Sequence, residues 1–147
     1  MKIQMRYRKG VFIVTYRKEK GEIYYLLLKR KLHWKGWEFP KGGVESGEVM
    51  KKAIVREIKE ETGQVALRVR SHRHKGKYKY GKEIVGRNEQ GQTFSLYSAE
   101  VLGKEVKVDK REHSGYSWKE FGKAVKLLTW PNQRKSLRIV DKSVKNE

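Results

Sequence analysis

Three glutamates, Glu57, Glu60 and Glu61, are crowded into one turn of a predicted helix within the segment VREIKEETGQ. Like charges at i and i+4, as at Glu57 and Glu61, repel one another on a helix, and anions near a helix C-terminus oppose its macrodipole. Burying even one unpaired carboxylate is costly, so three together require a cation. The cluster contains only carboxylates, without His or Cys, and such oxygen donors favour Mg²⁺, or Mn²⁺ as a substitute, over zinc. The sequence therefore predicts a divalent metal site.

The helical spacing predicts that these acids face inward. One stripe of the helix begins at Met50, is apolar in its first half, and continues through Glu57 and Glu61, with Glu60 beside them. The alternative is a decorated surface helix whose own cations neutralise the acids. The three lysines of the helix lie on the opposite arc and serve that alternative poorly, whereas Arg56 can reach round and orient one acid.

The chain has 147 residues, the size of one ordinary domain. We expect a single domain over residues 1–147, with its core at about residues 3–140. The chain has no cysteine, which excludes disulfides, thiolate chemistry and Cys-ligated zinc. No apolar run approaches the roughly 18 residues of a membrane span, and no signal-peptide stretch follows the basic start. We expect a cytoplasmic monomer.

The net charge is extreme, because 36 Lys and Arg residues face 17 Asp and Glu residues, which gives +19. Such an excess favours a polyanionic partner, either a phosphate chain or RNA. Solubility, or a lysine-rich proteome such as a thermophile's, explains the excess equally well. Charge alone therefore does not separate an enzyme from an RNA-binding module.

The elements that must position the acids alternate unevenly along the chain. Strands are predicted at 9–16, paired with 22–30, then at 64–71, at 93–102 and at the start of 114–130. Helices are predicted from Ser46 or Gly47 to Thr62, at the end of 114–130 and within 133–142. Gly63 is expected to end the first helix at the C′ position. Residues 31–48 are predicted as a loop, residues 74–92 as a basic hairpin or loop, and residues 141–147 as a disordered tail. This pattern indicates an α+β fold, a sandwich with a mixed β-sheet.

The segment GGVESGEVMKKAIVREIKEETGQ, which starts at Gly42, resembles the Nudix box. That pattern is Gly, five residues, Glu, seven residues, Arg-Glu, an aliphatic residue, any residue, Glu-Glu, any residue, Gly and an aliphatic residue. The matching positions are Gly42, Glu48, Arg56, Glu57, Ile58, Glu60, Glu61 and Gly63. Gln64 departs from the pattern, and Val65 can take the aliphatic role. The resemblance implies an α/β/α sandwich that hydrolyses a nucleoside diphosphate linked to another group.

The resemblance also implies a role for each matching residue. The metal ligands would be Glu57, Glu60, Glu61 and a backbone carbonyl at Lys41 or Gly42. Arg56 would orient a carboxylate, and Glu48 would support the site. Gly42 and Gly43 would let the backbone approach the metal and the phosphates. The metal would neutralise the pyrophosphate and lower the pKa of a water molecule.

Segments outside the box narrow the substrate. WEFPKGG is similar to a segment of the dinucleoside polyphosphate hydrolases and to related segments of mRNA-decapping enzymes and RNA 5′-pyrophosphohydrolases. This likeness places Lys41 beside the phosphates, and leaves Trp37 as either a substrate contact or plain core. Tyr80 falls where dinucleoside polyphosphate members tend to carry a tyrosine. Tyr78 and Tyr80 either stack on a base, beside lysines that attract phosphates, or form a cross-strand aromatic pair.

A second segment, EHSGYSW, resembles the Glu-His-x-x-Tyr-x-Trp segment of asymmetric diadenosine tetraphosphate hydrolases. The likeness assigns Glu112 to the metal site, as a ligand or base, and Tyr116 to the substrate. The sequence therefore predicts a Mg²⁺-dependent Nudix pyrophosphohydrolase of dinucleoside polyphosphates. The alternatives are an enzyme that trims or decaps RNA 5′ ends and a non-catalytic Nudix-fold RNA-binding protein. The chain keeps all four carboxylates of the box, which argues against a non-catalytic protein.

Overall fold

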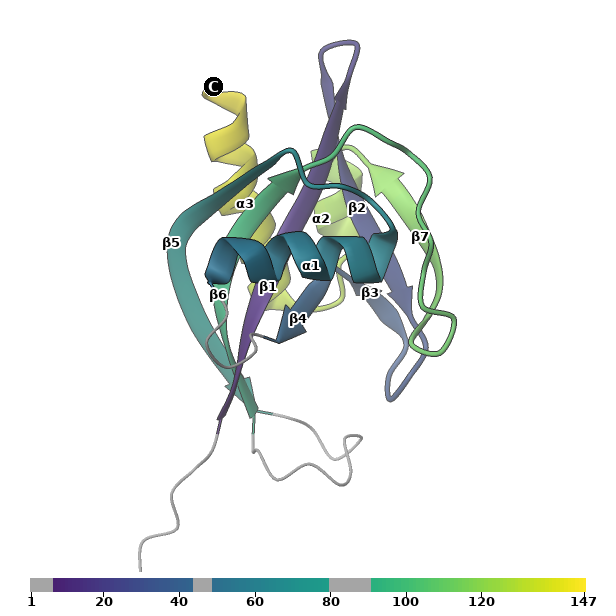
Figure 1. Cartoon of the computed structure of the whole chain (residues 1–147), viewed down its shortest axis with the longest axis vertical. Helices are drawn as coiled ribbons and strands as arrows, with labels where there is room; N and C mark the ends of the chain where they lie inside the picture. Colours follow the sequence, from purple (N-terminus) through teal and green to yellow (C-terminus); the bar gives the residue numbers. More distant parts are fainter. Residues whose placement is uncertain (1–6, 44–48, 80–90) are drawn as a thin grey trace, which may run out of the picture.

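The computed structural model describes residues 7–43, 49–79 and 91–147 (Figure 1). Within these ranges the strands are β1 (Tyr7–Glu19), β2 (Glu22–Arg30), β3 (Gly36–Glu38), β4 (Lys41–Gly43), β5 (Arg68–Lys79), β6 (Gly91–Glu100) and β7 (His113–Lys119). The helices are α1 (Met50–Thr62), α2 (Phe121–Leu127) and α3 (Pro131–Lys145). None of these helices is both long and apolar enough to cross a membrane.

A mixed sheet forms the centre of the described structure. Its main path runs β3-β2-β1-β6-β5, while β4 pairs with β1 and β7 pairs with β2. β1 runs parallel to β6 and antiparallel to both β2 and β4. The pairing divides along β1, because Gly10 to Phe12 face β4 whereas Tyr16 to Glu19 face β2. This division brings β4, and with it the start of the predicted box, beside the lower half of β1.

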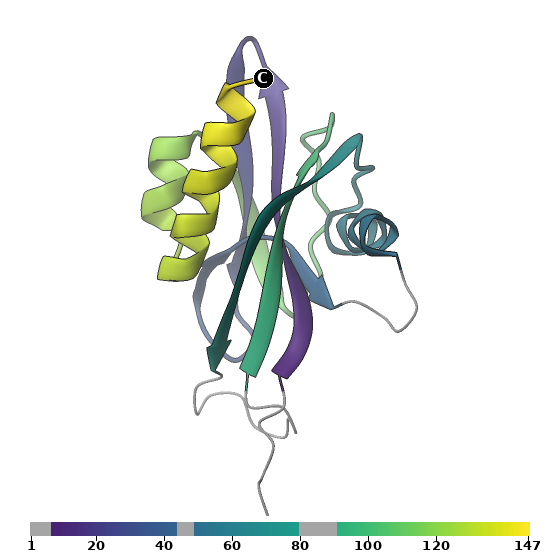
Figure 2. The ribbon, with the colours of Figure 1, turned by 90° about the vertical axis from the view of Figure 1, so that its left-hand side faces the viewer.

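Helices cover both faces of the sheet, with α1 on one side and α2 and α3 on the other (Figure 2). The alternation of side chains along β1 explains both layers, since successive residues point to opposite faces. Val11 and Ile13 pack with Ile54 and Ile58 of α1. The residues between and beyond them, which include Phe12 and Val14, join the core cluster under α2 and α3. The sheet between helical layers confirms the predicted α+β sandwich.

The predicted strand pair and the end of the first helix are confirmed. β1 and β2 form an antiparallel pair, and α1 ends at Thr62, followed by Gly63 with a left-handed φ of 78°. The predicted start of this helix is wrong in the described part, because α1 begins at Met50 after Val49. Residues 44–48 lie outside the described residues.

The segment predicted as a loop contains strands, and so does the segment predicted as a basic hairpin or loop. The segment 31–48 holds β3 and β4, whose three-residue pairings are too short to leave a periodic pattern. β5 begins at Arg68 rather than at residue 64, and continues to Lys79 into the segment 74–92, where its antiparallel pairing with β6 agrees with the hairpin alternative. Pairing with β6 overrides the turn-like composition there. Gly76 suits this pairing because a Cβ would lie 2.5 Å from the Phe94 ring.

The prediction of a disordered tail is wrong. α3 continues to Lys145, and both Asp141 and Val144 are buried in it. The hydroxyl group of Tyr25 donates a 2.6 Å hydrogen bond to Oδ1 of Asp141. Lys142 and Lys145 therefore lie on the outer face of a docked helix, whereas Asp141 and Val144 pack on its inner side.

Candidate active site

A cavity of about 550 Å³ gathers side chains from segments that are distant in the sequence. Its walls come from β1, β4, α1, the ends of β5 and β6, the loop after β2 and the start of α3. The acidic lining residues are Glu57, Glu61 and Glu112, the basic ones are Arg8, Arg30, Lys41 and Lys79, and the aromatic ones are Phe12, Trp34, Tyr78 and Trp130. The cavity thus combines carboxylates, cations and aromatic rings.

Gly42 brings the backbone of β4 against the carboxyl group of Glu57. A Cβ atom at position 42 would lie 2.2 Å from Cδ of Glu57, so any side chain there would displace the carboxylate. Arg56 links the same elements, because its Nη1 lies 3.0 Å from Oε1 of Glu57 and 3.1 Å from Oε2 of Glu60. Its Nη2 donates a 3.3 Å hydrogen bond to the carbonyl of Gly43. Arg56 therefore holds two glutamates and β4 together.

Glu61 lies on the cavity wall with Glu57, whereas Glu60 does not. Burial raises the pKa of the Glu61 carboxyl well above its ordinary value, and the negative charges of Glu38, Glu112 and Glu57 raise it further. The side chain of Glu60 is 59% exposed, which differs from the predicted inward position. Successive helical residues are rotated by about 100°, so Glu60 falls off the stripe that carries Glu57 and Glu61.

The donor set fits a hard divalent cation. Glu57 and Glu61 offer carboxylate oxygens at a wall where negative charges crowd one another, and the backbone of Gly42 in β4 lies against the Glu57 carboxyl. A bound cation would relieve that crowding, and Mg²⁺ prefers such oxygen ligands. Within residues 7–43, 49–79 and 91–147, no group of three His, Asp or Glu side chains forms a ready coordination shell. Glu48, the fourth acid of the box, lies outside the described residues.

Glu112 reaches the cavity from the loop before β7. Its carboxylate lies 3.8 Å from Nη1 of Arg30 and is partly exposed. Its carbonyl accepts hydrogen bonds from the backbone N–H groups of Lys31, at 2.9 Å, and Leu32, at 3.3 Å. The structure therefore brings this predicted site residue to the same cavity as Glu57 and Glu61, although it is far from them in the sequence.

A buried carboxylate that the sequence predictions did not include lies behind this wall. Glu38 has no exposed surface, and its carboxylate oxygens lie 3.2 Å from Nη1 of Arg30, 3.0 Å from Nζ of Lys41 and 2.8 Å from Nε2 of His113. Burial alone would raise the pKa of Glu38, but Lys41, His113 and Arg30 together lower it to about 2. The available signal was an acid between two aromatic residues in WEFPKGG.

Aromatic residues line the part of the cavity formed by the loop after β2 and the start of α3. Trp34 and Trp130 meet edge to face, with ring centroids 5.1 Å apart. Sequence reasoning missed both, because they lie in separate loops. Tyr78 lines the cavity as well, stacks on Phe12 at 6.2 Å and donates a 3.2 Å hydrogen bond to Gln92.

The other aromatic candidates are placed differently. Tyr80 lies outside the described residues. Trp37 packs against the core, and its backbone N–H donates a 2.9 Å hydrogen bond to Oγ1 of Thr129. Tyr116 is exposed on β7, where strand alternation gives it the same face as Trp118. Neither Trp37 nor Tyr116 lines the cavity.

The fold, the box and the site define a Nudix domain. The family model for the NUDIX domain matches residues 6–139, and the chain belongs to this family. It is similar to the Ap4A hydrolase of Caenorhabditis elegans, with 25% identity, a TM-score of 0.76, and coverage of 95% of this chain and 99% of that structure.

Two curated relatives share shorter segments. A Bacillus subtilis protein named for 8-oxo-dGTP diphosphatase activity is 39% identical over 83 residues, which are 55% of this chain and 46% of that protein. An RNA pyrophosphohydrolase of Photobacterium profundum is 35% identical over 82 residues, which are 54% of this chain and 45% of that protein. The chain therefore spans about half the length of the curated relatives it matches.

Proposed function

We propose that this chain is a metal-dependent pyrophosphohydrolase of nucleotides with long phosphate chains, with dinucleoside polyphosphates such as diadenosine tetraphosphate as the first candidates. The observation that carries the proposal is the composition of one cavity, in which Glu57, Glu61 and Glu112 share walls with four cations and with Trp34 and Trp130. Carboxylates suit the metal, cations suit the phosphates, and indole rings suit a base.

Each group has a chemical task in this proposal. Glu57 and Glu61, with a carbonyl of β4, would hold Mg²⁺ or Mn²⁺, and the exposed Glu60 would join them only by turning toward the cavity. When bound, the metal neutralises the pyrophosphate and lowers the pKa of a water molecule. Lys41 and Arg8 would position the phosphates, and Glu112 is the candidate base. In-line attack on phosphorus then depends mainly on positioning and charge stabilisation.

The likeness to the nematode Ap4A hydrolase over nearly the whole chain supports the dinucleotide. RNA 5′ ends are the second candidate, favoured by the relatives named as RNA pyrophosphohydrolases and by the net charge of +19. The two substrates share a phosphate chain attached to a nucleoside. They differ in the length of polyanion that must lie outside the cavity.

A substrate panel with Mg²⁺ tests the proposal. The panel contains diadenosine tetraphosphate, ADP-ribose, a nucleoside triphosphate and 5′-triphosphorylated RNA, each measured as kcat/KM at two salt concentrations. We expect diadenosine tetraphosphate to be preferred and its kcat/KM to depend weakly on salt. An RNA substrate that wins at both salt concentrations would replace the dinucleotide by the second candidate. No turnover of any member would refute the hydrolase.

Substitutions of aromatic residues test where the nucleobase of the substrate stacks. Trp130→Ala should lower kcat/KM for diadenosine tetraphosphate by about 1–3 kcal/mol, the contribution of one stacked base. Tyr116→Ala tests the alternative that Tyr116, rather than a cavity tryptophan, stacks on the nucleobase. An effect of Tyr116→Ala without an effect of Trp130→Ala would favour the role that the EHSGYSW segment implies. Neutralising Lys135 and Lys142 on α3, outside the cavity, should leave the dinucleotide reaction unchanged.

A further inference from the structure

The carboxylate of Glu38 links four strands behind the cavity. Glu38 ends β3, Arg30 ends β2, Lys41 begins β4 and His113 begins β7. All three partners lie within 3.2 Å of its oxygens. Because an ionised carboxylate only accepts hydrogen bonds, the Nε2 atom of His113 carries the hydrogen and is the donor of this hydrogen bond. One buried side chain therefore joins the ends of β2, β3 and β7, which are paired with one another through β2, to β4, which pairs with β1 instead.

Two of these partners also form the cavity wall. Arg30 and Lys41 line the cavity, and their cationic groups contact Glu38, which does not line it. A flexible lysine with four side-chain torsions loses freedom when one contact fixes it. Glu38 thus limits where both positive charges can lie at the cavity wall.

The third partner connects Glu38 to the loop of Glu112. His113 is 3% exposed and follows Glu112 directly. The Glu112 carboxylate lies 3.8 Å from Arg30, the other cation that Glu38 holds. The position of Glu112 is therefore coupled to Glu38 by two routes, through the neighbouring His113 ring and through Arg30.

We propose that Glu38 is a positioning residue for phosphoanhydride hydrolysis, which sets Lys41 and Arg30 against the phosphates and holds the Glu112 loop beside them. The inference rests on the proposed function. It assigns Glu38 an action through its partners and no contact with the substrate. A purely structural ion cluster would support stability in the same way, so the test must separate turnover from the fraction of folded protein.

Three variants provide that separation. Glu38→Gln removes the charge at nearly constant shape, and Glu38→Asp keeps the charge with a shorter reach. Asp141→Asn is the matched control, because Asp141 is also a buried carboxylate, 5% exposed, and accepts a hydrogen bond from Tyr25 on the α3 side of the sheet. Asp141 does not line the cavity.

Turnover is then expressed per binding-competent molecule. A non-hydrolysable methylene analogue of diadenosine tetraphosphate is titrated with Mg²⁺ present and followed by tryptophan fluorescence, because two tryptophans line the cavity. The titration gives the dissociation constant and the fraction of competent protein. Steady-state hydrolysis of diadenosine tetraphosphate by the same preparations gives kcat.

For Glu38→Gln we expect kcat per competent molecule to fall about 10-fold to 100-fold, as for a catalytic group misplaced by an ångström. The analogue should bind as tightly as to the parent or more tightly, since a negative charge near the phosphates is removed. Glu38→Asp should recover part of kcat, and Asp141→Asn should keep the parental value. Parental kcat per competent molecule in Glu38→Gln, or an equal loss in Asp141→Asn, would overturn the positioning role.

The test also covers a Glu38→Gln protein that does not fold and a parent protein without activity. If Glu38→Gln does not fold, His113→Leu decides, since leucine cannot donate the hydrogen bond that links Glu38 to the Glu112 loop. A lower kcat per competent molecule in His113→Leu supports the role, and an unchanged one overturns it. If the parent hydrolyses none of the panel substrates, the proposed function fails and the positioning role fails with it. An active parent with an unaffected variant refutes the positioning role alone.

Discussion

Glu61 is the side chain on which burial and the neighbouring negative charges act most strongly. Its carboxyl is buried near three other acids, so its pKa is raised well above the ordinary value. A raised pKa in the folded state means that the native protein binds more protons than the unfolded chain over the interval between the two pKa values. Stability contributed at this residue therefore decreases as pH rises through that interval.

Removing the ionisable group should remove this penalty. We expect Glu61→Gln to be more stable than the parent at neutral pH without divalent ions, and the difference to shrink as the pH falls from the raised pKa of Glu61 toward the ordinary glutamate pKa. Urea unfolding of both proteins across pH in the presence of a chelator measures the difference. The same variant should lose hydrolysis by orders of magnitude. A Glu61→Gln protein that turns over substrate at the parental rate would exclude Glu61 as a ligand.

Divalent ions should act on the same residue with the opposite sign. A cation that binds only the folded state stabilises it by mass action. We therefore expect millimolar Mg²⁺ to raise the Tm of the parent and to raise that of Glu61→Gln much less. Scanning calorimetry with and without Mg²⁺ checks this, and an equal rise in both proteins would place the bound ion elsewhere.

Gly42 makes a residue-level prediction of another kind. In Gly42→Ala the new Cβ would collide with the Glu57 carboxyl, so kcat should fall by at least about 10-fold while the fold remains intact. Gly122→Ala is the control, because nothing lies within 4 Å of a Cβ at that position in α2. It should leave turnover unchanged. If Gly42→Ala hydrolyses at the parental rate, the close approach of β4 to Glu57 is not required.

Among the elements, α3 makes the clearest prediction. Deleting residues 141–147 removes the buried Val144 and the Tyr25–Asp141 hydrogen bond. This should cost at least about 2 kcal/mol of unfolding free energy, the sum expected for one buried valine and one hydrogen bond. Chemical denaturation measures the loss.

Deleting only residues 146–147 is the control for that experiment. It removes the ion pairs of Glu147 with Lys18, Arg68 and Arg70. Such exposed pairs contribute about 0–1 kcal/mol, so the short deletion should be nearly neutral. Equal losses from the two deletions would mean that the last turn of α3 does not complete the core.

The sequence predicted those elements whose hydrophobic residues repeat over a long segment. The stripe of Ala53, Ile54 and Ile58 and the glycine after Thr62 were enough to place α1 and its end. β3 and β4 were missed because a three-residue strand has no period, and β5 was placed too early because its partner, not its own composition, sets its length.

The site was predictable only where its residues share a local segment. Fixed spacing in the box and in EHSGYSW brought Glu57, Glu61 and Glu112 into consideration. Trp34 and Trp130 escaped because loop positions carry no spacing rule, and they meet only after β2 and α3 have packed. Glu38 escaped because a buried acid looks like any other charged residue until its three partners are known.

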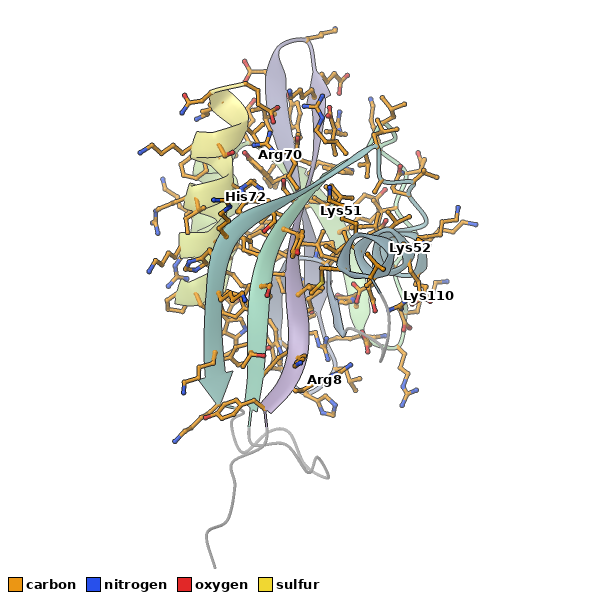
Figure 3. The ribbon with its side chains drawn as sticks, turned by 60° about the vertical axis from the view of Figure 1, so that its left-hand side comes forward. Arg8, Lys51, Lys52, Arg70, His72 and Lys110 are labelled. Atoms are coloured by element: carbon orange, nitrogen blue, oxygen red, sulfur yellow. The ribbon has the colours of Figure 1, made fainter. Side chains whose placement is uncertain are left out.

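At the scale of the molecule, the basic side chains that underlie the net charge of +19 are spread over several faces of the described structure. Lys51, Lys52 and Lys110 extend around α1, while Arg8 lies near the lower end of β1 (Figure 3). Further basic residues, including Lys135 and Lys142, are exposed on the opposite helical layer. Such a distribution attracts polyanions from many directions and selects no single path.

That distribution predicts weak, salt-sensitive binding of single-stranded RNA. Neutralising Lys51, Lys52 and Lys110 together should weaken binding of an oligonucleotide about as much as neutralising Lys135, Arg138 and Lys142 together. Fluorescence anisotropy at two salt concentrations measures both, and affinity should fall steeply with salt as counterions are released. If one triple variant abolishes binding while the other leaves it intact, the charge forms a defined RNA surface.

The parallel pairing of β1 with β6 has a consequence for how the chain acquires its structure. β1 ends at Glu19 and its partner begins only at Gly91, so this pairing must close a long loop before it yields any contact energy. Until then the β1–β2 hairpin has an open edge, the kind of surface that invites association between chains. The cavity needs β1, β5 and β6 together. During refolding, ligand binding should therefore return in the slowest phase, together with the last strand pairing, and dilute protein should recover it in higher yield than concentrated protein.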